Sequence, residues 1–417
     1  MTHLGLNSLA AAAAKGFQVI GFHPNRTLVE SLRAHRLPIN EPGLEETLAQ
    51  HQQRIRFDSD PAALETCDII YIAADVPTDN SGASDLVPIR QLIDQVRLCM
   101  GPDTILVILC QVPPGFTRSL NLAHNRLYYQ VETLIFGHAV ERALRPERFI
   151  VGCASPQSNL PAKFASYLSA FDCPVLAMRY ESAELAKISI NMCLVASVGV
   201  ANTMAELCEQ TGADWAEIVP SLKLDRRIGP YSYLNPGLGI AGGNLERDLA
   251  TVIALAEKHK TDAGIVAAWV ANSRYRKEWA WRTLQSRVLS EKPDARIAVL
   301  GLAYKEDTDS TKNSPALSLL AHLNGMDVVV FDPVVSPQDA RVSFPTTKDA
   351  KEAISNADVV CVMTPWAEFK RLSATDFSNR MKGRWLIDPY RVISRKSAEE
   401  AGLCYLTLGV GTVTNHA

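Results

Sequence analysis

The sequence lacks the features that mark several large classes of protein. Its nine cysteines are scattered singly, and no cysteine–histidine cluster has the spacing of a zinc site. Basic and acidic side chains nearly balance at 42 and 45, so neither nucleic acid nor a membrane surface is favoured as a partner. We find neither an apolar run long enough to span a membrane nor an N-terminal signal segment. These absences predict a cytoplasmic protein with reduced thiols and no metal site.

A chain of 417 residues is too long for one hydrophobic core, so we expect two or three domains. Over roughly the first 150 residues, apolar strand patterns alternate with helical ones. Continuous apolar runs such as 68–74 and 103–110 are typical of parallel strands that are covered on both faces. This alternation predicts a doubly wound sheet. The predicted strands are 17–22, 68–74, 103–110 and 149–152, with a short helix at 28–35.

The pattern changes between about residues 182 and 288, where strand signals disappear. Residues 182–212 carry apolar side chains at helical spacing and end at a glycine. Residues 245–287 form a second helical stretch, with a weak point near 262–264. We therefore expect a helical middle domain with one long central helix.

Strand signals return at residue 295, with expected strands at 327–333, 358–364 and 384–390. The whole chain is then an α/β protein: two Rossmann-like, doubly wound parallel-sheet domains joined by the helical middle domain. The predicted domain boundaries are 1–181, 182–292 and 293–417.

The N-terminus is short of the elements that open a dinucleotide-binding lobe. Such a lobe begins with a strand that runs into GxGxxG, which lets a pyrophosphate reach the start of a helix. Here Gly5 takes the place of the third glycine, and the first strand and the glycine-rich turn are truncated. His23 replaces the acid that usually binds the ribose hydroxyls, and Arg26 favours a 2′-phosphate. Two interpretations stay open: a working site for NAD or NADP, or a site that is either degraded or misassigned at its start, with the true start upstream of Met1.

The stretch GLGIAGGNLERD, residues 237–248, is rich in glycine and runs into a helix start. Glycines such as Gly239 and Gly242 allow a backbone to approach a ligand closely. The stretch contains no cysteine, serine or lysine, and Asn244 stands at its centre. It is therefore predicted to be an active-site loop without a nucleophile.

Six stretches in order carry a resemblance to a known family, and together they span nearly the whole chain. They are 37–48 (LPINEPGLEETL), 76–86 (VPTDNSGASDL), 111–117 (QVPPGFT), 141–152 (ERALRPERFIVG), 182–214 and 299–317 (VLGLAYKEDTDSTKNSPAL). The chain resembles the UDP-glucose/GDP-mannose dehydrogenase family. The resemblance implies an NAD-dependent enzyme, active in polysaccharide biosynthesis as a homodimer, that oxidises the C6 alcohol of a nucleotide-linked sugar. In that family a cysteine thiolate then carries a second oxidation through a thioester.

The resemblance also implies roles for individual residues. Lys187 and Asn191, four apart on one helix face, match the pair that stabilises the oxyanion and holds a water, and Asp248 matches a water-positioning acid. Glu132 matches the family's base, and Asn244 stands at the position of the nucleophilic cysteine. The residues matching cofactor contacts are Gly5, His23, Arg26, Pro77, Thr78, Gln111 and Lys312, and those matching substrate contacts are Arg227, Gly239, Gly242 and Lys305.

Asn244 leaves three interpretations of function open. An amide is no nucleophile at neutral pH, so the thioester route is excluded. The chain is then an oxidoreductase acting on a CH–OH group of a nucleotide sugar without that second step, or a non-catalytic nucleotide-sugar-binding homologue. The third interpretation is an epimerase-type reaction with a tightly held cofactor.

Overall fold

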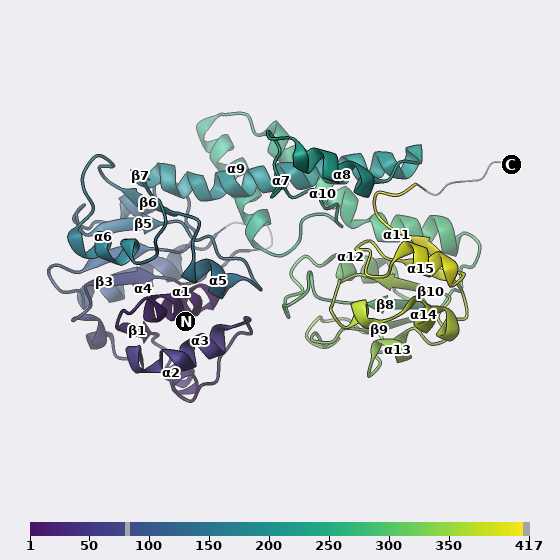
Figure 1. Cartoon of the computed structure of the whole chain (residues 1–417), viewed down its shortest axis with the longest axis horizontal. Helices are drawn as coiled ribbons and strands as arrows, with labels where there is room; N and C mark the ends of the chain where they lie inside the picture. Colours follow the sequence, from purple (N-terminus) through teal and green to yellow (C-terminus); the bar gives the residue numbers. More distant parts are fainter. Residues whose placement is uncertain (80–83, 412–417) are drawn as a thin grey trace. The chain divides into compact units, whose positions relative to one another are not determined.

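The computed structural model describes residues 1–79 and 84–411. They form two compact units, Met1–Ile190 and Asn191–Ala417, and the boundary falls inside the long helix α7 (Tyr180–Thr211). Figure 1 shows the sheets and helices of each unit. Each unit is described by itself below.

The first unit contains a five-stranded sheet whose order is β3-β4-β5-β6-β7. Its strands pair in parallel except for β5 and β6, which are antiparallel. The apolar runs predicted to be strands correspond to β3, β4 and β6. Every residue of β4 is buried, as a strand covered on both faces requires. The bounds are β3 (Ile69–Ile72), β4 (Ile105–Ile108), β5 (Leu127–Gln130), β6 (Phe149–Cys153) and β7 (Val175–Arg179).

Two further strands of this unit, β1 (Val19–Phe22) and β2 (Ile55–Asp58), form a separate parallel pair. Helix α1 (His3–Ala14) packs against β1, and its alanines allow a close approach because they add little bulk. Leu6, Leu9 and Ala10 of α1 belong to a buried cluster of this part of the unit. The remaining α-helices are α2 (Arg26–Arg33), α3 (Leu44–Gln50), α4 (Val87–Leu98), α5 (Ala139–Leu144) and α6 (Ala162–Ser169).

The second unit begins with the helical region that the sequence predicts. The expected weak point near 262–264 is a true break, because Lys260 adopts a left-handed conformation at the end of α9. Contrary to the sequence expectation, α7 is apolar enough to cross a membrane by length and composition alone, and 33% of its most apolar window is buried. The helices here are the rest of α7, α8 (Trp215–Leu224), α9 (Asn244–His259), α10 (Gly264–Lys277) and α11 (Trp279–Leu284).

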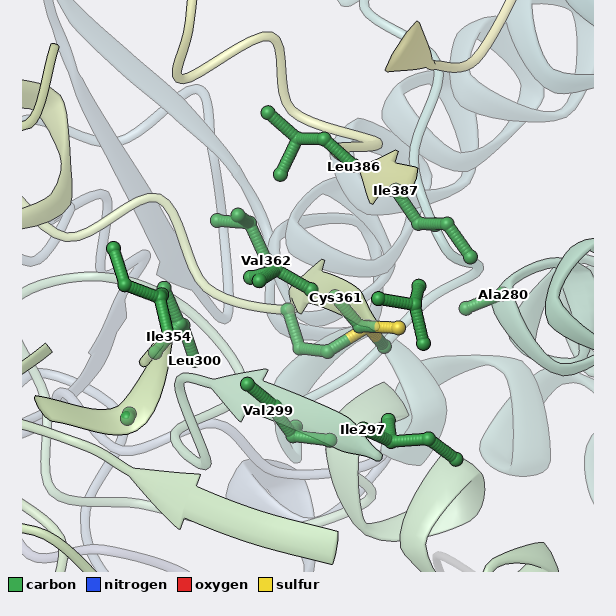
Figure 2. Close-up of a cluster of buried hydrophobic side chains, with 14 of the residues drawn as sticks. Ala280, Ile297, Val299, Leu300, Ile354, Cys361, Val362, Leu386 and Ile387 are labelled. Atoms are coloured by element: carbon green, nitrogen blue, oxygen red, sulfur yellow. The ribbon is translucent and has the colours of Figure 1, made fainter. Parts of the chain in front are cut away.

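A second five-stranded sheet, wholly parallel, completes this unit with the order β12-β11-β10-β8-β9. Figure 2 shows side chains of three strands meeting in its core, with Ala280 of α11 beside them. The strands are β8 (Ile297–Leu300), β9 (Val328–Phe331), β10 (Val359–Val362), β11 (Trp385–Ile387) and β12 (Cys404–Leu406), and the helices are α12 (Pro315–His322), α13 (Ala350–Ala353), α14 (Ala374–Arg380) and α15 (Arg395–Glu400). The predicted α/β fold with a long central helix is confirmed.

Candidate active site

An ion pair links the end of β5 to helix α7 in the first unit. Glu132 follows β5 by two residues, and its carboxylate accepts a hydrogen bond from the amide of Leu134. Its Oε2 lies 3.3 Å from Nζ of Lys187, and the two side chains are 19% and 13% exposed. The structure thus brings the predicted base and the predicted oxyanion-stabilising lysine together. The ammonium compensates the carboxylate charge in this half-buried position.

One turn before Lys187, α7 carries a buried acid that the sequence interpretation missed. Glu184 is fully buried, and its two carboxylate oxygens accept hydrogen bonds from the amides of Gly115 (2.6 Å) and Thr117 (2.8 Å). Burial raises the pKa of Glu184, and the two amides oppose that shift. This carboxylate therefore fastens the loop after Gln111 to the helix that carries Lys187.

We expect Glu184→Gln to lower the free energy of unfolding by about 1–3 kcal/mol, because a carboxamide offers one acceptor oxygen to two buried N–H donors. Urea unfolding measures the loss. Glu181→Gln is the matched control on the same helix; its partner Arg118 is 43% exposed, so we expect a loss below about 1 kcal/mol. Equal losses in the two variants contradict the anchoring role.

In the second unit, Asn191 and Asp248 form a buried polar pair. Asn191 is 6% and Asp248 1% exposed, and Nδ2 of Asn191 donates a short hydrogen bond to Oδ2 of Asp248. Nε of Arg247 lies 3.7 Å from the other carboxylate oxygen. The amide and the guanidinium fix the orientation of the Asp248 carboxylate. Lys187 lies one helical turn before Asn191 in α7.

The glycine-rich loop before α9 is held by its own scaffold. Ser273 accepts a hydrogen bond from the amide of Ile240 (2.7 Å), and the amide of Gly242 donates to the carbonyl of Lys312 (3.1 Å). At Gly239, with φ of +78°, an added Cβ lies 2.3 Å from the Ser273 carbonyl oxygen. At Gly242, with φ of +89°, it lies 2.9 Å from the Tyr304 ring.

Internal packing therefore requires these two glycines, a reason that the sequence interpretation did not foresee. At both glycines, protein atoms rather than a ligand occupy the space where a Cβ would stand. The close approach of a ligand to this backbone stays a prediction.

Asn244 is exposed and is the first residue of α9. The side chain of Lys312 lies beside the preceding residue, with its Nζ 3.6 Å from a Cβ placed on Gly243. Lys305 lies over the Tyr304 ring, 5.9 Å from its centre. The structure thus gathers the predicted residues Gly242, Asn244, Lys305 and Lys312 around one loop. Among the described residues Arg227 does not contact them: its side chain is 89% exposed and pairs with Asp225.

Apart from Lys312, which belongs to the second unit, the predicted cofactor residues lie in the first unit, at the starts of α1 and α2 and after strands. Thr2 caps α1: its hydroxyl accepts from the amide of Gly5 (3.2 Å) and donates to the carbonyl of Ala73 (2.8 Å). An added Cβ on Gly5 lies 3.4 Å from that carbonyl, an ordinary van der Waals distance, so packing alone does not require glycine here. No acid occupies the first turn of α1. These features fit the pyrophosphate of NAD.

The other predicted cofactor residues follow strands of the same unit. His23 follows β1, Gln111 follows β4, and Thr78 forms an isolated bridge with Ser84. Pro77 precedes that bridge. Residues 80–83 of the 76–86 motif lie outside the described residues.

Each of the two units contains a mainly parallel five-stranded sheet, and doubly wound sheets of this type bind nucleotides at the carboxyl ends of their strands. This architecture defines a class, the nucleotide-binding α/β proteins. Residues 1–168 match the NAD binding domain of the UDP-glucose/GDP-mannose dehydrogenase family, residues 181–274 its central domain, and residues 298–395 its UDP binding domain. The chain belongs to this family, and its cofactor is NAD.

Individual relatives match this chain over almost its full length. The UDP-glucose 6-dehydrogenase of Rickettsia prowazekii (strain Madrid E) is 28% identical, with 98% of this chain and 97% of the relative covered. The solved UDP-glucose dehydrogenase of Pyrobaculum islandicum is 27% identical with a TM-score of 0.83, covering 97% and 95% of the two chains. The UDP-D-ManNAc dehydrogenase of Pyrococcus horikoshii shares the fold, with a TM-score of 0.84 at 22% identity and coverage of 98% and 97%. The family and these relatives indicate a nucleotide-sugar dehydrogenase, an oxidoreductase.

Proposed function

We propose that this chain oxidises a CH–OH group of a UDP- or GDP-linked sugar to the aldehyde and does not complete the thioester-dependent second oxidation. One observation carries the proposal: Asn244 opens α9 at the end of the glycine-rich loop, one helical turn before Asp248 of the buried Asn191–Asp248 pair. The polar machinery of the loop is kept, while residues 237–248 contain no thiol.

The first oxidation needs only groups that the chain has. The alcohol loses a proton and a hydride; bound NAD supplies the hydride acceptor, and the products are the aldehyde, NADH and a proton. The Glu132 carboxylate takes the hydroxyl proton, and the Lys187 ammonium stabilises the alkoxide as negative charge develops on oxygen. The buried Asn191–Asp248 pair orients a water molecule in this proposal.

The second oxidation by the family's route needs a thiolate that adds to the aldehyde. The carboxamide of Asn244 forms no such adduct at neutral pH, although it can donate a hydrogen bond to the aldehyde oxygen. Cys361 offers no substitute, because it is buried in the core of the second sheet and burial raises the pKa of its thiol to about 12.

An anaerobic assay with NAD and a panel of UDP- and GDP-sugars tests the proposal. We expect NADH formation from at least one sugar and an oxime of the product after trapping with hydroxylamine. Absence of NADH with every sugar, in a protein that binds both nucleotides, favours a non-catalytic binding homologue instead. An epimerised sugar without net NADH formation favours the epimerase-type reaction.

We propose that the chain acts in the cytoplasm as a homodimer, in polysaccharide or related sugar biosynthesis, with domains at 1–181, 182–292 and 293–417. Apolar side chains on successive turns of α7 support the dimer: Val200, Met204 and Leu207 are 55%, 40% and 51% exposed. An exposed apolar stripe of this kind marks a protein interface.

We expect Leu207→Arg to convert the dimer to a monomer, because the substitution buries an unpaired charge in the proposed interface. Size-exclusion chromatography with light scattering measures the mass. Leu98→Arg is the control, since Leu98 is 87% exposed at the end of α4. A monomeric wild-type protein, or a dimer that survives Leu207→Arg, contradicts this interface.

A further inference from the structure

The turn after β1 carries an unusual pair of side chains for an NAD site. In a doubly wound lobe, the position at the end of this strand faces the adenosine ribose. A carboxylate there accepts hydrogen bonds from the ribose hydroxyls and repels a 2′-phosphate. This chain has His23 at that position and Arg26 three residues later, at the start of α2. The turn therefore lacks the negative charge that discriminates against a 2′-phosphate.

The hydrogen bonding of His23 defines which ring nitrogen carries the proton. The amide of Asn25 donates to Nδ1 of His23 at 3.1 Å, so Nδ1 presents its lone pair inward to the turn. The proton of the neutral ring is then on Nε2, which is a donor. Burial lowers the pKa of His23, which keeps the imidazole neutral at pH 7. A neutral N–H donor serves a ribose hydroxyl and a phosphate oxygen equally well.

Arg26 supplies a positive charge in the same turn. It is exposed, and within residues 1–79 and 84–411 it is joined to no carboxylate. The side chain of Asn25 caps α2 by accepting from the amide of Leu28 (3.1 Å), which fixes the backbone from which Arg26 projects. The first turn of α2 contains no acid. A guanidinium in this setting can bind a phosphate through two parallel hydrogen bonds.

The carboxylate of Asp58, at the end of the neighbouring strand, is paired with two arginines. Asp58 ends β2 in register with Phe22, and its backbone carbonyl accepts from the amide of His23. Its carboxylate lies 3.6 Å from Arg56 and 3.9 Å from Arg33, and it accepts from the amide of Asp60. Arg33 and Arg56 thus offset the charge of Asp58, an acid that would oppose a phosphate here.

We infer that this lobe accepts NADP as well as NAD, with the 2′-phosphate bound between Arg26 and Nε2 of His23. The inference rests on the proposed function in one respect, since it takes the first lobe as a working cofactor site.

The test is a binding titration of the full chain with NADH and with NADPH, followed by nicotinamide fluorescence. The fragments 5′-AMP and 2′,5′-ADP, titrated by calorimetry, isolate the contribution of the 2′-phosphate. We expect the two reduced cofactors to bind with dissociation constants within about tenfold of each other. We expect 2′,5′-ADP to bind at least as tightly as 5′-AMP.

Two variants locate the phosphate. Arg26→Ala should weaken NADPH about 10-fold or more, as expected for loss of a charge-assisted pair, and leave NADH within about twofold. His23→Asp should weaken NADPH about 10-fold or more and leave NADH as tight or tighter. Arg54→Ala is the control: this exposed arginine precedes β2, at the opposite end of the two-stranded sheet, so we expect no change for either cofactor.

The outcomes separate this inference from the proposed function. NADH binding with a preference above tenfold over NADPH overturns the inference alone. Variants that leave the preference unchanged overturn it as well. Failure of both cofactors to bind overturns the NAD-dependent function together with the inference.

Discussion

Asp248→Asn should lower kcat by about 10²–10³-fold while the protein stays folded, the range typical for loss of a group that orients or accepts a proton. The Asp248 carboxylate is 1% exposed and is held by Asn191 on one oxygen. The carboxamide has the same shape and keeps an oxygen for Asn191. The variant removes the negative charge and one acceptor, which are the properties that orient a water molecule.

NADH absorbance at saturating sugar measures kcat, and thermal unfolding checks the fold. Glu257→Gln is the matched control, since it removes an exposed carboxylate from the same helix, α9. We expect the control to stay within about twofold of the wild type. An Asp248→Asn variant with the same kcat as Glu257→Gln shows that the buried pair only stabilises the fold.

Gly239→Ala should be the most destabilising single substitution in the glycine-rich loop, with a loss of about 3 kcal/mol or more. A left-handed φ of +78° disfavours any Cβ, and this Cβ lies 2.3 Å from the Ser273 carbonyl oxygen. The loop must shift to relieve the contact, which breaks the buried hydrogen bond from the amide of Ile240 to Ser273.

Urea unfolding of the two-unit chain, followed by tryptophan fluorescence, measures this loss. Gly229→Ala is a close control, because Gly229 has φ of +84° and open space around the added Cβ. The expected loss of unfolding free energy for Gly229→Ala is then only that of placing a Cβ in the left-handed backbone conformation, about 1–2 kcal/mol. If the two variants lose the same stability, the contact with Ser273 is not what requires glycine at position 239.

Strands could be predicted where the sequence has a continuous aliphatic run; β5, with the sequence LYYQ, is buried at every residue but was missed because it has no such run. Strands β4 and β6 are buried at every residue, so they appear as continuous apolar runs. Strand β7 was missed because four of its five residues are exposed, which removes the apolar signal. The short strand β2 was missed for a similar reason, since none of its residues is fully buried. The antiparallel pairing of β5 with β6 depends on contacts between segments and leaves no local signal.

The candidate site was predictable in part. Asn191 and Asp248 were each recognised through the family resemblance alone, and their hydrogen bond, between residues 57 apart along the chain, was not predicted. Glu184 could not be recognised from the sequence. Its partners are backbone amides 67 and 69 residues away, and a backbone amide is present whatever the side chain is. The loop glycines were recognised, but their packing reason was not, because Ser273 and Tyr304 belong to other elements.

The yield of NADH per sugar tests the central claim most directly. A limiting amount of an accepted nucleotide sugar is consumed to completion under anaerobic conditions, with hydroxylamine present to trap an aldehyde. One NADH per sugar, together with the oxime, is the result expected of a chain with Asn244 at the start of α9. Two NADH per sugar and a sugar carboxylate would contradict the account, because they require a second oxidation that this loop has no thiol to carry.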